Sequence, residues 1–153
     1  MTENSLNRRS ALLMAAGAMT TLIFPTLGFA KSLVSKTKAG VAIKGHDTTA
    51  YFQKGSHGKG SKTHVVEWEG AKWRFASAEE AALFKTNPAA YTPQFGGFCT
   101  RAMSFGSKVH SNPKVWRIYK DKLYLFAAPK GGKFFDKGQD KMIEKAQANW
   151  DNL

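Results

Sequence analysis

Apolar and polar residues alternate in two separate stretches of the sequence, with the period of a half-buried β-strand. In residues 64–75 the alternating apolar positions are Val66, Trp68, Trp73 and Phe75. Glu69 and Gly70 divide this stretch and supply a turn, so it predicts a β-hairpin. Residues 115–126 predict a second hairpin that turns near Lys120 and Asp121. The apolar positions that could share one face of it are Trp116, Ile118, Leu123 and Leu125.

A helical pattern follows each predicted hairpin. Ser77 and Glu80 have the spacing of a capping box, which predicts a short helix that ends at Asn87. A longer helix is predicted over residues 133–150, with an apolar stripe that consists of Met142, Ile143, Ala146 and Trp150. These elements predict a single α+β domain, in which two or three helices pack on a small antiparallel sheet built from hairpins.

The first 30 residues have the three-part composition of a signal peptide. Arg8 and Arg9 precede an apolar stretch that runs to about Phe24, and Ala30 closes a run suited to cleavage. The paired arginines indicate the twin-arginine route, so we expect residues 1–30 to be removed and the chain to be periplasmic. The alternative is an N-terminal membrane anchor. The apolar stretch is shorter than the roughly 20 residues that a spanning helix needs, so we expect no transmembrane segment in the mature chain.

The remaining chain is strongly basic. Residues 31–40 are polar and aperiodic and are interpreted as a mobile basic leader, whereas residues 41–153 form the predicted domain. The formal net charge of the whole chain is +12, which favours anionic surfaces or acidic proteins as partners. Export and the lack of a base-reading motif argue against nucleic acid. Four lysines recur on the last predicted helix, at positions 133, 137, 141 and 145. Acidic residues three positions away suggest that they form a solvated face.

The sequence contains a single cysteine, Cys99, which therefore has no disulfide partner within the chain. Several interpretations remain open: a buried inert residue, a bond to another molecule, a metal ligand or a reactive thiol. Arg101 would favour the thiolate, and Met103 would suit a second sulfur ligand if the segment is helical. His46 and Asp47 are a second candidate pair, in which the carboxylate either orients the imidazole or caps a turn. Thiolate, thioether and imidazole together favour copper, particularly Cu(I).

Several ordered blocks of the chain carry a family resemblance. They are residues 42–52, residues 73–77 leading to Phe84, Asn87, Pro88 and Tyr91, residues 95–99, residues 122–125, and Ala146 with Asn149 and Trp150. On these blocks the chain resembles the exported YHS-domain proteins from about Val41 to Trp150. The resemblance implies a compact α+β domain with a link to transition metals. It also points to Cys99, because some relatives carry selenocysteine at this position. Shorter metal-linked relatives have a cysteine where this chain has Ala76, and the long form usually has tyrosine where this chain has His46.

Three hypotheses follow. The first is a periplasmic binding protein, rather than an enzyme, that holds copper or a similar soft metal through Cys99, with His46 and Met103 as further ligands. The second is a thiol redox protein that uses Cys99 as its nucleophile. The third is a non-catalytic module that binds a partner through its basic surface.

Overall fold

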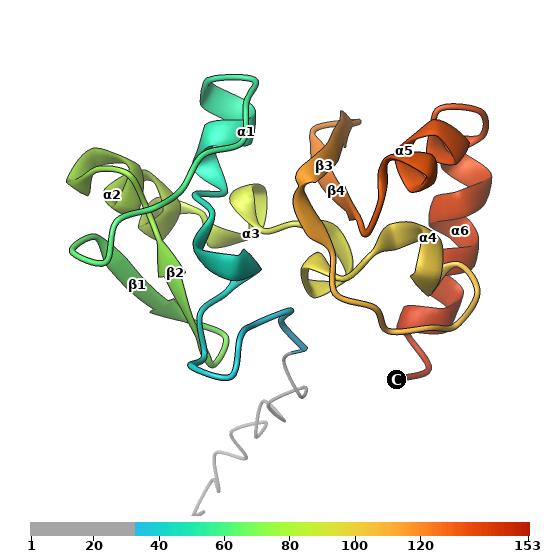
Figure 1. The fold of residues 1–153 in the computed structure, drawn as a ribbon, viewed down its shortest axis with the longest axis horizontal. Coiled ribbons are helices and arrows are strands. Elements are labelled where there is room, and N and C mark those ends of the chain that lie inside the picture. The colour runs from blue at the N-terminus through green and yellow to red at the C-terminus, as the bar shows by residue number, and fades with distance from the viewer. Residues whose placement is uncertain (1–32) are drawn as a thin grey trace, which may run out of the picture.

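The structure is a computed structural model that describes residues 33–153, so the expected signal peptide over residues 1–30 lies outside the described residues. The elements are, in chain order, η1 (Ile43–Gly45), α1 (Thr49–Gln53), β1 (Val65–Trp68), β2 (Ala71–Arg74), α2 (Ala78–Thr86), α3 (Pro88–Tyr91), η2 (Gln94–Gly97), α4 (Thr100–Met103), β3 (Asn112–Tyr119), β4 (Lys122–Phe126), α5 (Pro129–Phe135) and α6 (Gln139–Trp150). The predicted α+β class is confirmed (Figure 1). Within the described part of the chain, however, there are six α-helices, several of them a single turn.

The two predicted hairpins are both present, and each forms its own two-stranded antiparallel sheet. The expectation of one sheet built from both hairpins is therefore wrong. The residues of both turns have positive φ angles, 48° at Glu69 and 67° at Gly70, and 49° at Lys120 and 56° at Asp121. Two consecutive left-handed residues are typical of turns that match the twist of the flanking strands.

Strand β4 joins the two halves of the molecule because both of its faces are buried. Leu123 and Leu125 pack into one apolar cluster together with the β1–β2 hairpin and α2. Tyr124 and Phe126 point the other way, into a second cluster with η2, α4, α5 and α6. Four consecutive buried residues in a strand require cover on both faces, and the two halves on either side of β4 provide it (Figure 1).

The first cluster is built largely from aromatic rings on β2 and α2. Trp73 stacks on Phe84 with 5.3 Å between ring centroids, and its indole nitrogen donates to the carbonyl of Trp68 at 2.9 Å. Helix α2 begins as predicted, because the Ser77 hydroxyl accepts a hydrogen bond from the Glu80 amide at 3.2 Å. The Glu80 carboxylate forms an ion pair with Lys54.

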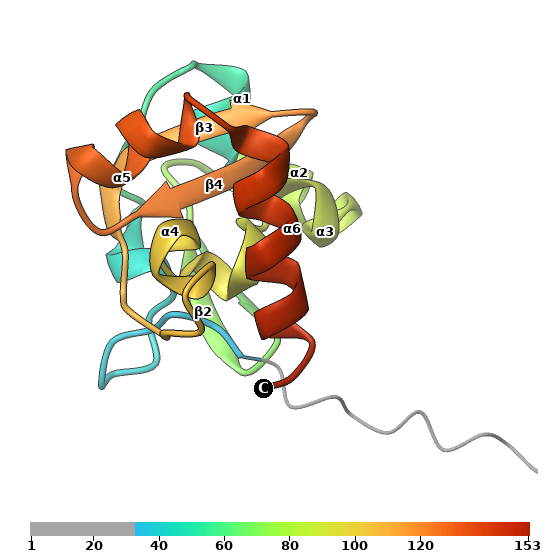
Figure 2. The ribbon, with the colours of Figure 1, turned by 90° about the vertical axis from the view of Figure 1, so that its right-hand side faces the viewer.

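The long helix expected over residues 133–150 is in fact two helices. Helix α5 begins at Pro129 and ends before Asp136, and α6 begins after Gly138. Arg117 on β3 donates two hydrogen bonds to the Asp136 carboxylate, at 2.8 and 2.7 Å, and anchors the break between the helices. Helix α6 then packs across α4, as Figure 2 shows.

The segment expected to be a mobile basic leader is packed onto the domain over residues 33–40. The Val34 side chain is buried, and the Ser35 amide donates to the carbonyl of Gly96 at 2.8 Å. The Ser35 carbonyl accepts from the amide of Ile43 at 3.0 Å. The sequence showed no period here because this backbone pairs with isolated loop positions rather than with a regular strand. Within residues 33–153, no helix is long and apolar enough to cross a membrane.

Candidate functional site

Two glycines determine how the backbone reaches Cys99. Gly96 and Gly97 have φ angles of +58° and +79°, in the left-handed region that residues with a side chain rarely adopt. A Cβ atom on Gly96 would lie 1.8 Å from the carbonyl oxygen of Leu33, and one on Gly97 would lie 2.3 Å from the Ile43 Cδ1 atom. Both the backbone angles and the close contacts therefore require glycine at these two positions.

Cys99 occupies the N-cap position of α4. Its amide donates to the carbonyl of Val109 at 2.8 Å, and its sulfur accepts a hydrogen bond from the Ala102 amide at 3.5 Å. The side chain is 4% exposed, so the sulfur lies near the surface of the second cluster without projecting into solvent.

Cys99 lines a pocket of about 300 Å³. The other residues that line it are Arg101, Ala102, Phe105, Ala127, Ala128, Lys130 and Gly131. The two charged side chains among these described residues are the cations Arg101 and Lys130. A cationic, partly apolar pocket beside a sulfur atom attracts anionic reagents toward it.

The structure brings Met103 close to Cys99. Cys99, at the N-cap, and Met103, at the end of α4, are four residues apart, and the Met103 amide donates to the Cys99 carbonyl at 2.9 Å. Both residues belong to the second cluster. This is the helical spacing under which Met103 could be a second sulfur ligand. The Met103 side chain is fully buried, and its carbonyl accepts a hydrogen bond from Asn149 on α6 at 2.9 Å. Met103 therefore also anchors α4 to the last helix.

His46 lies in different surroundings, at the beginning of the loop before α1. The residue is 6% exposed, and its ring centroid lies 6.0 Å from that of His57. Its Nδ1 atom has no hydrogen-bond partner among the described residues. Burial, reinforced by the nearby Lys59 ammonium group, lowers the pKa of His46 to about 4. The residues around it differ from those that line the Cys99 pocket. Of the three predicted metal ligands, the structure thus brings together Cys99 and Met103 and places His46 elsewhere.

Asp47 is a structural residue. One of its carboxylate oxygens accepts hydrogen bonds from the Thr49 amide at 2.9 Å and from the Thr49 hydroxyl at 2.7 Å. The other accepts from the amide of Ala76 at 2.8 Å, and the residue is fully buried. The carboxylate thus caps the start of α1 and ties it to the end of the first hairpin, which is the turn-cap alternative.

Sequence reasoning missed Lys130, which follows the first residue of α5 and faces the Cys99 pocket. No local motif connects it with a cysteine 31 positions earlier; the fold brings them together because α4 packs on α5. Within residues 33–153, no group of three or more His, Cys, Asp and Glu residues is arranged to hold a metal ion. We found no family model, no curated protein and no solved structure that matches the chain.

Proposed function

We propose that this is an exported protein of the YHS type that acts through Cys99 as a reactive thiol toward anionic, sulfur-containing partners. The observation that carries this proposal is the position of the chain's one thiol on a pocket whose charged groups, Arg101 and Lys130, are both cationic. The sequence blocks shared with YHS proteins and the twin-arginine pattern before residue 30 support the family and the export.

The chemistry that suits this site is thiol–disulfide exchange. The Cys99 thiolate attacks one sulfur of an external disulfide, forms a mixed disulfide with it and releases the other sulfur as a thiolate. The chain contains no second cysteine that could resolve the mixed disulfide. A second external thiol must therefore attack it and regenerate Cys99, so the natural partner is a thiol–disulfide couple in solution.

Two disulfide reagents of opposite character test the proposal on the folded full chain. Dithiobis-nitrobenzoate carries two carboxylates, whereas dithiodipyridine is neutral. We expect the native protein to react with each reagent at one site, and the Cys99→Ser variant to react with neither. Reaction that begins only after unfolding by denaturant would show that the thiol is an inert packing residue, and the proposal would fail.

The charge of the pocket is tested through the ratio of the two reaction rates. Lys130→Gln removes one cation from the pocket, and Lys85→Gln on α2 removes an exposed cation in the other half of the molecule. One nearby charge is worth about 0.5–1 kcal/mol at a surface, which corresponds to a rate change of about two- to fivefold. We expect this fall in the anionic-to-neutral rate ratio for Lys130→Gln. Lys85→Gln should leave the ratio unchanged.

A second candidate function is soft-metal binding, favoured by the Met103 thioether in the same buried cluster as Cys99. Thiolate and thioether sulfur are ligands that select Cu(I). Equilibrium dialysis of the full chain with Cu(I) should then show stoichiometric uptake that Cys99→Ser abolishes and Met103→Leu weakens. His46→Asn is expected to leave uptake unchanged, because the His46 ring lies beside His57. Equal uptake by the native chain and Cys99→Ser would refute this function.

A further inference from the structure

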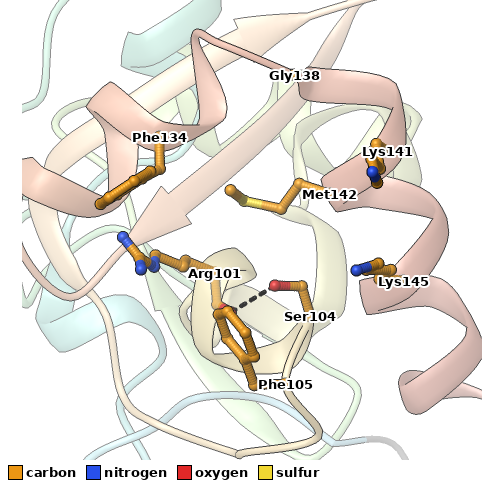
Figure 3. Close-up of a pocket in the computed structure, with 8 residues that line it drawn as sticks. All are labelled: Arg101, Ser104, Phe105, Phe134, Gly138, Lys141, Met142 and Lys145. Atoms are coloured by element: carbon orange, nitrogen blue, oxygen red, sulfur yellow. Dashed lines mark hydrogen bonds between the residues drawn. The ribbon is translucent and has the colours of Figure 1, made fainter.

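A second pocket, of about 280 Å³, lies next to the Cys99 pocket, between α4, α5 and α6. Figure 3 shows the side chains that line it, with Arg101 beside Phe134 on one side, Met142 in the middle, and Lys141 and Lys145 on the other side. The apolar ones are Phe105, Phe134 and Met142, and the cationic ones are Arg101, Lys141 and Lys145. Arg101 and Phe105 also line the Cys99 pocket, so the two pockets share a wall.

Two acidic residues close to this pocket in sequence, Asp136 and Asp140, form ion pairs with cations on β3 and on the turn that follows it. Arg117 forms an ion pair with Asp136 at 2.7 Å, and Lys120 forms one with Asp140 at 2.8 Å. The sequence suggested instead that Lys137 would pair with Asp140, and Lys141 with Glu144, each three positions away. Among the described residues, Lys141 and Lys145 form no ion pair, and no carboxylate lines the pocket. The pocket is therefore uniformly positive.

The aromatic side chains hold the arginine in place. The Arg101 guanidinium carbon lies 3.7 Å from the centroid of the Phe134 ring and 5.8 Å from that of Phe105. A stacked guanidinium keeps its N–H edge available for an oxyanion, with less conformational freedom to lose on binding. Phe105 is 73% exposed and Phe134 is 40% exposed, so two large apolar side chains face solvent beside three cations. Exposed apolar side chains that lie together, rather than scattered singly, are typical of binding sites.

We propose that this pocket binds a small aromatic anion, such as an aryl carboxylate or sulfonate. The aromatic body would pack against Phe134 and Met142, and the anionic group would bind Lys141 and Lys145 on the α6 side of the pocket, across Met142 from Arg101 (Figure 3). The size of the pocket suits a small ligand with one fused ring system rather than a folded partner. This proposal does not depend on the thiol chemistry, because none of its contacts involves the cysteine sulfur.

A matched pair of fluorescent probes tests it on the full chain. Anilinonaphthalene sulfonate has the aromatic body and the negative charge, whereas phenylnaphthylamine has a similar body without the charge. We expect saturable binding of the sulfonate at one site and an affinity that falls as salt is raised. The double variant Lys141→Gln/Lys145→Gln should bind the sulfonate about tenfold more weakly, because it loses two screened contacts to the anion. Its affinity for phenylnaphthylamine should not change.

The control is Lys62→Gln/Lys85→Gln, which changes the net charge equally at two exposed sites outside the pocket. It should bind both probes as the native chain does. Phe134→Ser should weaken the binding of both probes. An unchanged near-ultraviolet circular dichroism spectrum would show that the variants are folded. The proposal would be overturned if the two double variants weakened sulfonate binding equally. It would also be overturned if neither variant weakened it. A third contrary result would be binding to phosphatidylglycerol vesicles that depends on Phe105 and is not reduced by the sulfonate.

Discussion

Acid should destabilise this protein through His46, because its imidazole is buried beside cations. The residue is 6% exposed, and the neighbours that act on it electrostatically are Lys59, His57 and Lys114. Burial first, and then the Lys59 charge, lower its pKa from 6.5 to about 4. The perturbation that isolates this effect is His46→Phe, which keeps a planar ring and removes the titrating group together with the unpaired Nδ1 atom.

The size and sign of the effect follow from that pKa. Below pH 6.5 the unfolded chain takes up a proton on His46, whereas the folded chain does so only near pH 4. The unfolded state therefore binds more protons in this window, and the free energy of unfolding falls as the pH falls. The contribution of neutral His46 to the free energy of unfolding is fully present above pH 6.5 and is lost between pH 6.5 and 4. The pKa shift corresponds to about 3 kcal/mol.

Urea unfolding of both proteins at a series of pH values between 7.5 and 3.5 measures this contribution. We expect the free energy of unfolding of the native chain to fall by about 3 kcal/mol more than that of His46→Phe over this range. All other titrating groups are common to the two proteins, so their effects cancel in the difference. Parallel pH curves for the two proteins would refute the reasoning, since they would mean that His46 is protonated as easily in the folded state as in the unfolded one.

Three further predictions concern the backbone around the site and the N-terminus. Asp47→Asn should lower the free energy of unfolding by about 2–3 kcal/mol, because the carboxylate accepts hydrogen bonds from two backbone amides and from the Thr49 hydroxyl. A urea unfolding midpoint equal to that of the native chain would contradict the capping role. Gly97→Ala should cost at least about 2 kcal/mol, from its φ of +79° and the contact with Ile43, and a neutral effect in thermal unfolding would show that the loop relaxes freely. N-terminal sequencing of the exported protein should return a chain that begins near Lys31, whereas Met1 or Thr2 would refute the cleavage.

The elements whose signals are local could be predicted from the sequence. Alternation placed both hairpins, and turn residues at 69–70 and 120–121 placed their turns. The capping box at Ser77 marked the start of α2, because the cap needs nothing beyond the first helical turn.

Features that depend on distant contacts could not be predicted. The break between α5 and α6 is anchored by Arg117, which precedes Asp136 by 19 residues. The neighbours of Cys99 and His46 were equally hidden, because adjacency in sequence says little about which side chains meet. Asp140 forms its ion pair with Lys120, 20 positions earlier, although its spacing from Lys137 suggested local pairing. These contacts form only once the two halves of the molecule pack against the two faces of β4.

The rate at which dithiobis-nitrobenzoate reacts with the native chain tests the central claim most directly. We predict release of one equivalent of nitrothiobenzoate per chain under native conditions, at a rate that falls with added salt and is lost in Cys99→Ser. A sulfur that reacts only once the chain has been unfolded, at a rate indifferent to the charges of Arg101 and Lys130, would contradict the account.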